Sequence, residues 1–242
     1  MKKLLTSAFS VACVLASLSS CSKPEKAETC TGKAESTCAA KEENPVFSID
    51  TLVADSIILP APQTTGGMPL YDALSARATF RNMKPDALSD QTISNLLWSA
   101  TGVNRPVADD PRLTAPTARN AQEIDVYVCT KAAVYLYHPV GHKLTLVNKG
   151  DFRAQAGKNP FHANSGVDLI MVANYDKMKD WDEHSMAFYG ATDTGYISQN
   201  IYLFCAANDL KTCVCGNIDR EEIAKFINLK NGYVTLSQPV GM

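Results

Sequence analysis

Two arginines flank a threonine at alternate positions in the segment Ala76-Arg77-Ala78-Thr79-Phe80-Arg81. In an extended backbone, side chains that lie two residues apart project to the same side. Two guanidinium groups and one hydroxyl gathered in this way suit a phosphate, because each donates hydrogen bonds to its oxygens. Alone, an R-x-T-x-R pattern at the end of a helix is more often a solvated surface, so it needs support from the rest of the chain.

Cysteines are the second group of residues that can do chemistry. Cys213 and Cys215 alternate along a predicted strand, so both thiols can face one side. One interpretation is a redox pair that exchanges electrons with a cofactor. The other interpretation is that the two are small residues packed in a core, or that one of them is bonded to Cys205. We favour this second interpretation because no neighbouring base lowers the pKa of either thiol. The sequence does not determine the disulfide pairing; Cys30 and Cys38, in the tail, could close a small loop with each other.

Metal and hydrolase chemistry are not indicated. The four histidines are scattered, and none lies at metal-ligand spacing from another, so we expect no metal site. His138 and His142 flank a predicted turn and are expected in solvent, and His162 is expected to be an ordinary loop residue. Ser185 and Ser198 have no neighbouring base, which excludes a hydrolase triad.

Composition limits the classes of partner. The chain has 242 residues, of which 45% are hydrophobic and 20% charged, as in a soluble domain with a sizeable core. The net charge is −2, so no global positive field attracts nucleic acid or anionic lipid. We expect a small-molecule substrate and no nucleic-acid partner.

The N-terminus reads as an export and anchoring signal. Residues 2–18 join two lysines to a short apolar stretch, which is typical of a secretory signal and too short to span a bilayer. The stretch ends in Leu18-Ser19-Ser20-Cys21, which resembles the lipobox of bacterial lipoproteins; an ordinary signal with an incidental Cys21 is the alternative. We expect residues 1–20 to be removed and Cys21 to be lipidated, so that the domain is anchored to a cell-envelope membrane.

Residues 21–44 are expected to be a flexible tether. They are rich in Lys, Glu, Ser, Thr and Ala and carry no large apolar side chain, so they cannot bury enough surface to offset their ordering entropy. The folded domain is therefore expected to occupy residues 45–242.

Hydrophobic periodicity and turn residues predict the elements of this domain. Ser89 or Asp90 can begin a helix whose apolar face repeats until Gly102 ends it. The other predicted helices lie at 69–77, 195–208 and 220–227, and the predicted strands at 125–130, in a hairpin over 133–147, and at 168–174, 211–215 and 233–240. The continuous apolar run at 168–174 indicates a buried central strand. The pattern predicts an α+β domain with a mostly antiparallel central sheet wrapped by helices.

Several motifs, in order, resemble those of FMN-binding nitroreductases. Residues 76–81 resemble the R-x-S-x-R/K signature near the start of these proteins. The further matching segments are residues 97–106 (LWSATGVNRP), 112–122 (RLTAPTARNAQ), 195–203 (GYISQNIYL), 212–219 (TCVCGNID) and 238–241 (QPVG). The hairpin at 133–144 (AVYLYHPVGHKL) is similar to a unit of the SagB/ThcOx-type dehydrogenase branch. The resemblance covers nearly all of residues 55–242 and implies a nitroreductase-like fold with FMN at a homodimer interface.

The resemblance also implies roles for individual residues. Those implied to hold the FMN phosphate are Arg77, Thr79 and Arg81, with a backbone contact from Ala78. Those implied to approach the isoalloxazine ring, from the partner subunit, are Pro116, Thr117, Ala118, Asn120 and Gln122. Those implied to place backbone groups beside the reactive edge of the ring are Val214, Cys215 and Gly216.

The chain departs from the family pattern at several positions. Many relatives use further basic residues near the C-terminus on the phosphate, whereas this sequence ends at Met242; Arg105 or Arg112 is a candidate substitute. Arg119 stands where the branch often has glycine, and Val214 replaces a common proline. The Lys-Tyr pair of azoline-forming relatives is also absent, which argues against oxidation of peptide heterocycles.

The resulting hypothesis is an FMN-dependent oxidoreductase on a membrane of the cell envelope. It would pass electrons through the flavin to or from a small organic substrate in ping-pong order, without a catalytic triad. The substrate and the electron donor (nicotinamide, quinol, redox protein or the substrate itself) stay open. The alternatives are a non-catalytic ligand-binding lipoprotein with a degenerate nitroreductase fold and, third, a flavin-binding assembly factor for a membrane redox complex.

Overall fold

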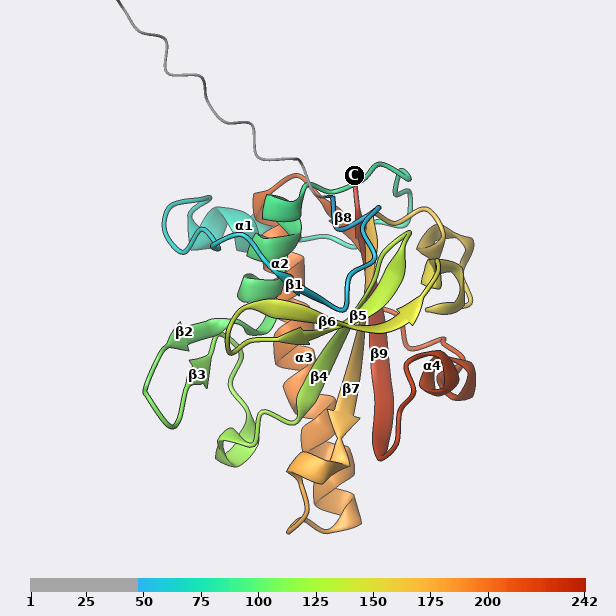
Figure 1. Ribbon diagram of the computed structural model, residues 1–242. Helices are drawn as coiled ribbons and strands as arrows, with labels where there is room; N and C mark the ends of the chain where they lie inside the picture. The colour runs from blue at the N-terminus through green and yellow to red at the C-terminus, as the bar shows by residue number, and fades with distance from the viewer. Residues whose placement is uncertain (1–47) are drawn as a thin grey trace, which may run out of the picture. The chain divides into compact units, whose positions relative to one another are not determined.

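An antiparallel sheet forms the centre of the computed structural model, which describes residues 48–242 (Figure 1). Within these residues the sheet has seven strands, and every neighbouring pair is antiparallel. Their order across the sheet is β1 (Ser56–Ile58), β6 (Lys143–Lys149), β5 (Ala133–His138), β4 (Ile124–Cys129), β7 (Val167–Asn174), β9 (Gly232–Gly241) and β8 (Lys211–Thr212). The signal, Cys21 and the tether expected at residues 1–44 lie outside the described residues.

The predicted central strand is confirmed as β7. It pairs with β4 on one side and β9 on the other, with Leu169 opposite Val128 and Ile170 opposite Ser237. Seven of its eight residues are buried, because helices cover both faces of the sheet at this point. The predicted hairpin is also confirmed: β5 and β6 are joined by a turn in which Gly141 has a φ of 82°.

Two hydrophobic clusters lie on opposite faces of the sheet. Leu169 and Met171 of β7 belong to the cluster with α2 (Asp90–Thr101) and α3 (Glu183–Ala207), whereas Ile170 and Val172 belong to the cluster with α4 (Arg220–Phe226). Alternate side chains of one strand therefore serve two cores, as the pleat requires. The predicted α+β architecture, a central antiparallel sheet wrapped by helices, is confirmed.

The first two helices begin and end close to the residues that the sequence predicted as their ends. α1 (Leu70–Ala76) follows Pro69, and α2 (Asp90–Thr101) follows Ser89, whose hydroxyl accepts a hydrogen bond from the Thr92 N–H at 3.1 Å. The apolar face of α2 is almost completely buried in the core. Gly102 ends the helix, and the small sheet of β2 (Val103–Arg105) and β3 (Arg112–Leu113) follows it.

The third helix is much longer than predicted. α3 (Glu183–Ala207) has 25 residues and begins twelve residues before the predicted start at 195. Asp182 caps it by accepting a hydrogen bond from the Ser185 N–H at 2.9 Å. The part before residue 195 contains Gly190, Thr192 and Thr194, which are weak helix formers, and the residues buried in it are Gly190, Asp193 and Thr194.

The C-terminal elements differ from prediction by small amounts. β8 ends at Thr212, and the rest of the predicted strand continues as a single bridge between Cys215 and Ser237. α4 (Arg220–Phe226) is capped by Asp219 and ends one residue before the predicted limit, and β9 is one residue longer at each end than predicted. β1, β2 and β3 carried no sequence signal, because each has only two or three residues.

Candidate functional site

The R-x-T-x-R segment leaves the end of α1 and crosses to the edge of the sheet. Arg77 caps α1 through its N–H, and the Phe80 N–H donates to the carbonyl oxygen of Thr212 in β8 at 3.0 Å. Thr79 and Arg81 are exposed, and Arg77 and Ala78 are half-buried. Within residues 48–242, neither arginine lies within 4.0 Å of a carboxylate. The segment therefore presents two cations that the described protein does not neutralise.

Tyr202 of α3 links this segment to the strand at 212–216. Its hydroxyl lies 3.0 Å from the Thr79 hydroxyl oxygen and accepts a hydrogen bond from the Val214 N–H at 3.0 Å. Its ring lies beneath the guanidinium of Arg77, 5.3 Å from the ring centroid. Sequence reasoning missed this residue, although it lies in the segment 195–203 that resembled the family; only the fold shows its partners.

After β8, residues 213–216 alternate in burial. Cys213 and Cys215 are buried in the core, whereas Val214 is half-buried and Gly216 is exposed. The Cys215 N–H and carbonyl both bond to Ser237, at 2.8 and 3.1 Å, which holds the strand in place. Among the described residues the Gly216 N–H has no acceptor, so it is available to a ligand.

The two cysteine sulfurs lie 3.9 Å apart, but inside the core. Burial, followed by the neighbouring Cys213, raises the pKa of Cys215 to about 12, so this side chain is a neutral thiol at physiological pH. The four cysteines of residues 48–242 are all free, and Cys205 is not bonded to either member of the pair. This environment favours the packing interpretation of the pair over the redox one.

The donors at these two places fit the two ends of FMN. Arg77, Arg81 and the Thr79 hydroxyl provide charged and neutral donors for a phosphate, a group that offers only acceptors. The free Gly216 N–H fits an acceptor atom at the edge of a flat heterocycle. A cavity of about 380 Å³ between α3, β9 and α4 adjoins this glycine through Leu236, to which a Cβ added at Gly216 would lie 3.6 Å away.

The segment at 116–122, expected at the flavin ring, has a strained and heavily bonded backbone. It contains the short turn η1 (Ala118–Asn120), and three of its non-glycine residues have left-handed φ values near 50°: Arg119, Asn120 and Gln122. Side chains of the same chain stabilise it. The Ala118 N–H donates to Asp193 Oδ2 at 2.8 Å, the Gln122 N–H donates to Thr117 Oγ1 at 3.0 Å, and the Asn120 amide donates to Asp110.

Two buried carboxyl groups lie under this segment. Glu123 is fully buried, and among the described residues neither of its carboxyl oxygens has a hydrogen-bond partner. Burial, and then the neighbouring Asp193 of α3, raise the pKa of Glu123 to about 8, so it is protonated at neutral pH. Asp193 accepts the Ala118 N–H through Oδ2, so the pair lies directly against this segment. Sequence reasoning missed this pair because its members are 70 residues apart.

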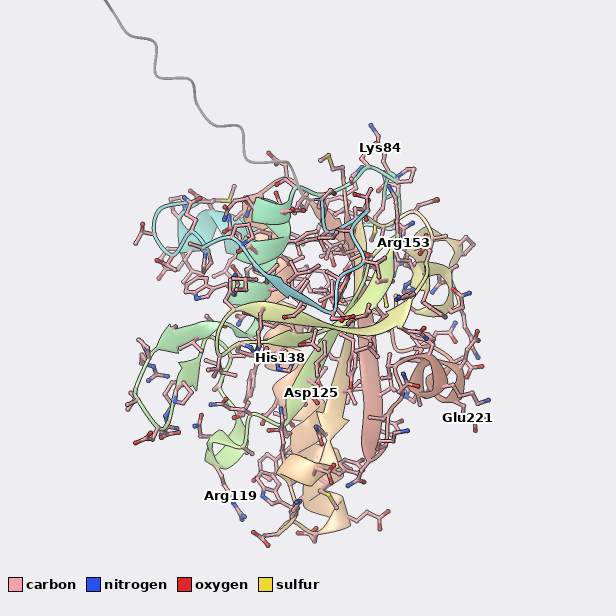
Figure 2. All side chains as sticks on the ribbon, viewed as in Figure 1. Lys84, Arg119, Asp125, His138, Arg153 and Glu221 are labelled. Atoms are coloured by element: carbon pink, nitrogen blue, oxygen red, sulfur yellow. The ribbon has the colours of Figure 1, made fainter. Side chains whose placement is uncertain are left out.

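The two candidate segments lie far apart within one protomer. Asp193 holds one and Tyr202 the other, and nine residues of an α-helix make two and a half turns and rise ~13.5 Å. The two side chains therefore leave α3 on opposite sides as well as at different heights. Figure 2 shows Arg119, which belongs to the segment at 116–122, and Lys84, which follows Arg81 closely in the sequence, at opposite ends of the molecule.

Several side chains differ from expectation. The His142 ring bonds to Ser94 Oγ at 2.8 Å and to the Tyr137 hydroxyl at 2.9 Å, so this histidine is a structural link rather than a solvated residue. His162 is fully buried, with Nδ1 2.5 Å from an oxygen of Asp168. Burial raises the pKa of Asp168 to about 6, although His162 opposes the shift.

The two arginines that raised questions in the sequence have partners. Arg112, a candidate substitute on the phosphate, already bonds to Asp110. The Arg119 guanidinium lies 4.9 Å from the centroid of Trp181, at the tip of α3. Its φ of 54° gives a physical reason for the glycine that the branch often has there, because glycine adopts this conformation without strain.

Metal ligands and membrane spans were sought in the same part of the chain. Within residues 48–242, no three His, Cys, Asp or Glu side chains gather as metal ligands would. None of the helices described there combines the length and apolar character needed to cross a bilayer.

Comparison with known proteins supports the interpretation of the motifs. The sequence profile described as the Nitroreductase family matches residues 74–242. A candidate nitroreductase of Methanocaldococcus jannaschii is 28% identical over 184 residues, 71% of this chain and 90% of that protein. The crystal structure of a candidate nitroreductase of Ralstonia eutropha has 33% identity and a TM-score of 0.74, covering 82% of this chain and 95% of that one.

A more distant structure shares the fold alone. The NADPH:FMN oxidoreductase of Vibrio harveyi, solved in complex with NAD⁺, is 14% identical with a TM-score of 0.53. The match covers 71% of this chain and 67% of that one.

Proposed function

The chain belongs to the nitroreductase family, and we propose that it is an FMN-dependent oxidoreductase acting on a small organic substrate. Family membership supports an oxidoreductase; the cofactor, the order of the reaction and the location are the proposal. One observation carries the proposal. Tyr202 links the segment that holds the unneutralised Arg77 and Arg81 to the backbone at Val214, two residues before the exposed Gly216.

In this proposal Arg77, Thr79 and Arg81 hold the FMN phosphate. Their donors are pre-arranged, because Arg77 rests on the Tyr202 ring and the backbone of the segment is bonded to β8. At the other end, the Gly216 N–H would donate to the edge of the ring, and Val214 and Cys215 would place backbone groups beside it. FMN, when bound, supplies the transfer of hydride or electrons, so no protein nucleophile is required. The resemblance implies that donor and acceptor bind in turn, in ping-pong order.

The proposal includes a homodimer, because one protomer does not bring its two segments together. The segment at 116–122 lies on the opposite side of α3 from Thr79 and Val214, so a site built from both needs a second copy of the chain. α3 carries the surface for it: Phe188, Tyr189 and Tyr196 are 56%, 37% and 45% exposed. Gly195 lies between Tyr189 and Tyr196 in the sequence. Apart from its neighbours and the backbone of its own helix, no atom of the described residues lies within 4 Å of the position where its side chain would begin, so another helix can approach closely.

We further propose that the enzyme works at the cell envelope, anchored through lipid on Cys21. This rests on the residues before Cys21 in the sequence. The hairpin similarity places the chain with the SagB/ThcOx-type branch in our proposal. Soluble nicotinamide cofactors are expected to be scarce outside the cytoplasm, so the donor is a quinol, a redox protein or the substrate itself.

Flavin binding by the purified full-length chain tests the proposal. We expect twin flavin absorbance bands in wild type, and an affinity for FMN lowered roughly 10- to 100-fold in Arg77→Ala, since the variant loses a charge-assisted hydrogen bond. Lys149→Ala removes an exposed cation from β6 and serves as the matched control, with unchanged affinity. A folded, colourless wild type that ignores added FMN would contradict the proposal and favour the non-catalytic ligand-binding reading.

A further inference from the structure

The hydroxyl of Tyr202 stands between the two ends of the proposed flavin site. It lies 3.0 Å from Thr79 Oγ1 and 3.0 Å from the Val214 nitrogen, and the side chain is only 8% exposed. The three residues come from the segment after α1, from α3 and from the strand after β8. No other hydrogen bond of Thr79 is present among the described residues, so its hydroxyl is shared only with Tyr202.

Counting hydrogens shows which direction of this chain of bonds suits a phosphate. A backbone N–H can only donate, so Val214 donates to the Tyr202 oxygen. The bond between the Tyr202 and Thr79 hydroxyls can run in either direction, since each group has one hydrogen and can also accept. Only the direction from Tyr202 to Thr79 leaves the Thr79 hydrogen free. A phosphate offers only acceptors, so this is the direction in which Thr79 can donate to it.

We propose that Tyr202 is a positioning residue that makes Thr79 a donor to the flavin phosphate and ties it to the backbone at the ring edge. This inference rests on the proposed function, because it concerns the same site. Successive bonds that run in one direction polarise one another, so each strengthens the next. Loss of the phenol hydroxyl would let the Thr79 hydroxyl turn toward other partners and weaken its bond to the phosphate.

Replacement by phenylalanine isolates this hydroxyl. Tyr202→Phe keeps the aromatic ring that supports the Arg77 guanidinium, so the positive charge that Arg77 offers to the phosphate is unchanged. We expect the affinity for FMN to fall about tenfold. The affinity for riboflavin, which has no phosphate, should fall at most about threefold.

A double-mutant comparison separates this role from general damage to the fold. Thr79→Val removes the donor itself and should also weaken FMN about tenfold. If Tyr202 acts through Thr79, the double variant binds FMN no more weakly than Thr79→Val alone. Tyr71→Phe, on an 82% exposed tyrosine of α1, is the matched control and should leave both affinities unchanged.

Fluorescence titration of the full-length proteins with FMN and riboflavin gives the result. An unchanged FMN affinity in Tyr202→Phe overturns the assignment. So does an equal loss for FMN and riboflavin, or an additional loss in the Thr79→Val background. A wild type that binds neither flavin overturns the proposed function itself, and this outcome is distinct because it appears before any substitution is made.

Discussion

The segments at 77–81 and at 116–122 are both irregular, and both rest on α3, yet they are stabilised in different ways. The first has few bonds of its own, and its charged side chains have no carboxylate partner in the described part of the chain. The second has its backbone and side-chain donors bonded within its own protomer and contains three left-handed residues. The first therefore offers charge to a ligand, whereas the second offers a fixed shape.

This difference indicates how one helix can serve two sites. A segment that contributes charge needs only to be anchored, and a single tyrosine hydroxyl does this. A segment that contributes shape must be stabilised against its own strain, and this requires the buried acid pair Glu123 and Asp193. The two demands are separated at opposite sides of α3, and in our proposal they meet again across a two-fold axis.

Separating the protomers of the proposed dimer should have the largest effect, because the two segments could then no longer contribute to one site. Tyr196→Asp places a charge on the exposed apolar face of α3, where burial against a second copy would desolvate it. We expect a monomer by light scattering, with FMN affinity at least about tenfold lower because the partner's shape-giving segment is lost.

Val140→Asp is the matched control for that substitution. It adds the same charge to a 61% exposed residue in the β5–β6 turn and should leave both dimer and affinity unchanged. A Tyr196→Asp dimer with wild-type affinity would contradict the idea that the two segments meet across copies.

The dependence of thermal stability on pH should reveal the buried Glu123 under the segment at 116–122. The pKa of Glu123 is about 8 in the folded chain, against an ordinary value of 4.5. The folded state keeps a proton that the unfolded state loses between these values, so the free energy of unfolding falls as pH rises from 4.5 to 8. Lys177 opposes and Asp193 reinforces this shift. Glu123→Gln should raise Tm at pH 9 by at least about 3 °C and change it little at pH 4.

Thermal melts from pH 4 to pH 9 check this. Glu221→Gln, on an exposed glutamate of α4, should follow the wild-type profile. If Glu123→Gln also follows it, the second segment does not depend on a buried proton.

The smallest effect is expected at Arg119. Glycine relieves the strain of a φ of 54° but loses the contact with Trp181, and each is worth about 0.5 to 1 kcal/mol. These terms nearly cancel, so Arg119→Gly should move Tm by less than about 3 °C. Ala121→Gly, where the backbone is already right-handed, should lower Tm more. The opposite order in calorimetry would show that the strain is not stabilised locally.

The sequence predicted those elements whose signals lie close together along the chain, and it missed those that depend on distant residues. α2 was predicted to within a residue, because Ser89, the apolar period and Gly102 are all local. The central, buried position of β7 followed from its unbroken apolar run. The part of α3 before residue 195 was missed because Gly190, Thr192 and Thr194 carry no local helix signal.

The candidate site divides along the same line. The basic cluster and the strand at 212–216 could be recognised as motifs, since each is contiguous. Tyr202 and Glu123 could not, because the role of each depends on a partner far away along the chain, Thr79 for Tyr202 and Asp193 for Glu123. The buried His162 and the bonded His142 were misjudged for the same reason: a loop position does not reveal what packs over it.

The interval between Asp193 and Tyr202 has a consequence for sequence change in this chain. Each residue of an α-helix turns the chain by 100°, so adding or deleting one residue between these positions would swing one of the two side chains away from its partner. Substitutions there can be tolerated wherever they preserve packing. Insertions and deletions there cannot be tolerated, because the eight residues from Thr194 to Ile201 set both the distance and the rotation between the two side chains.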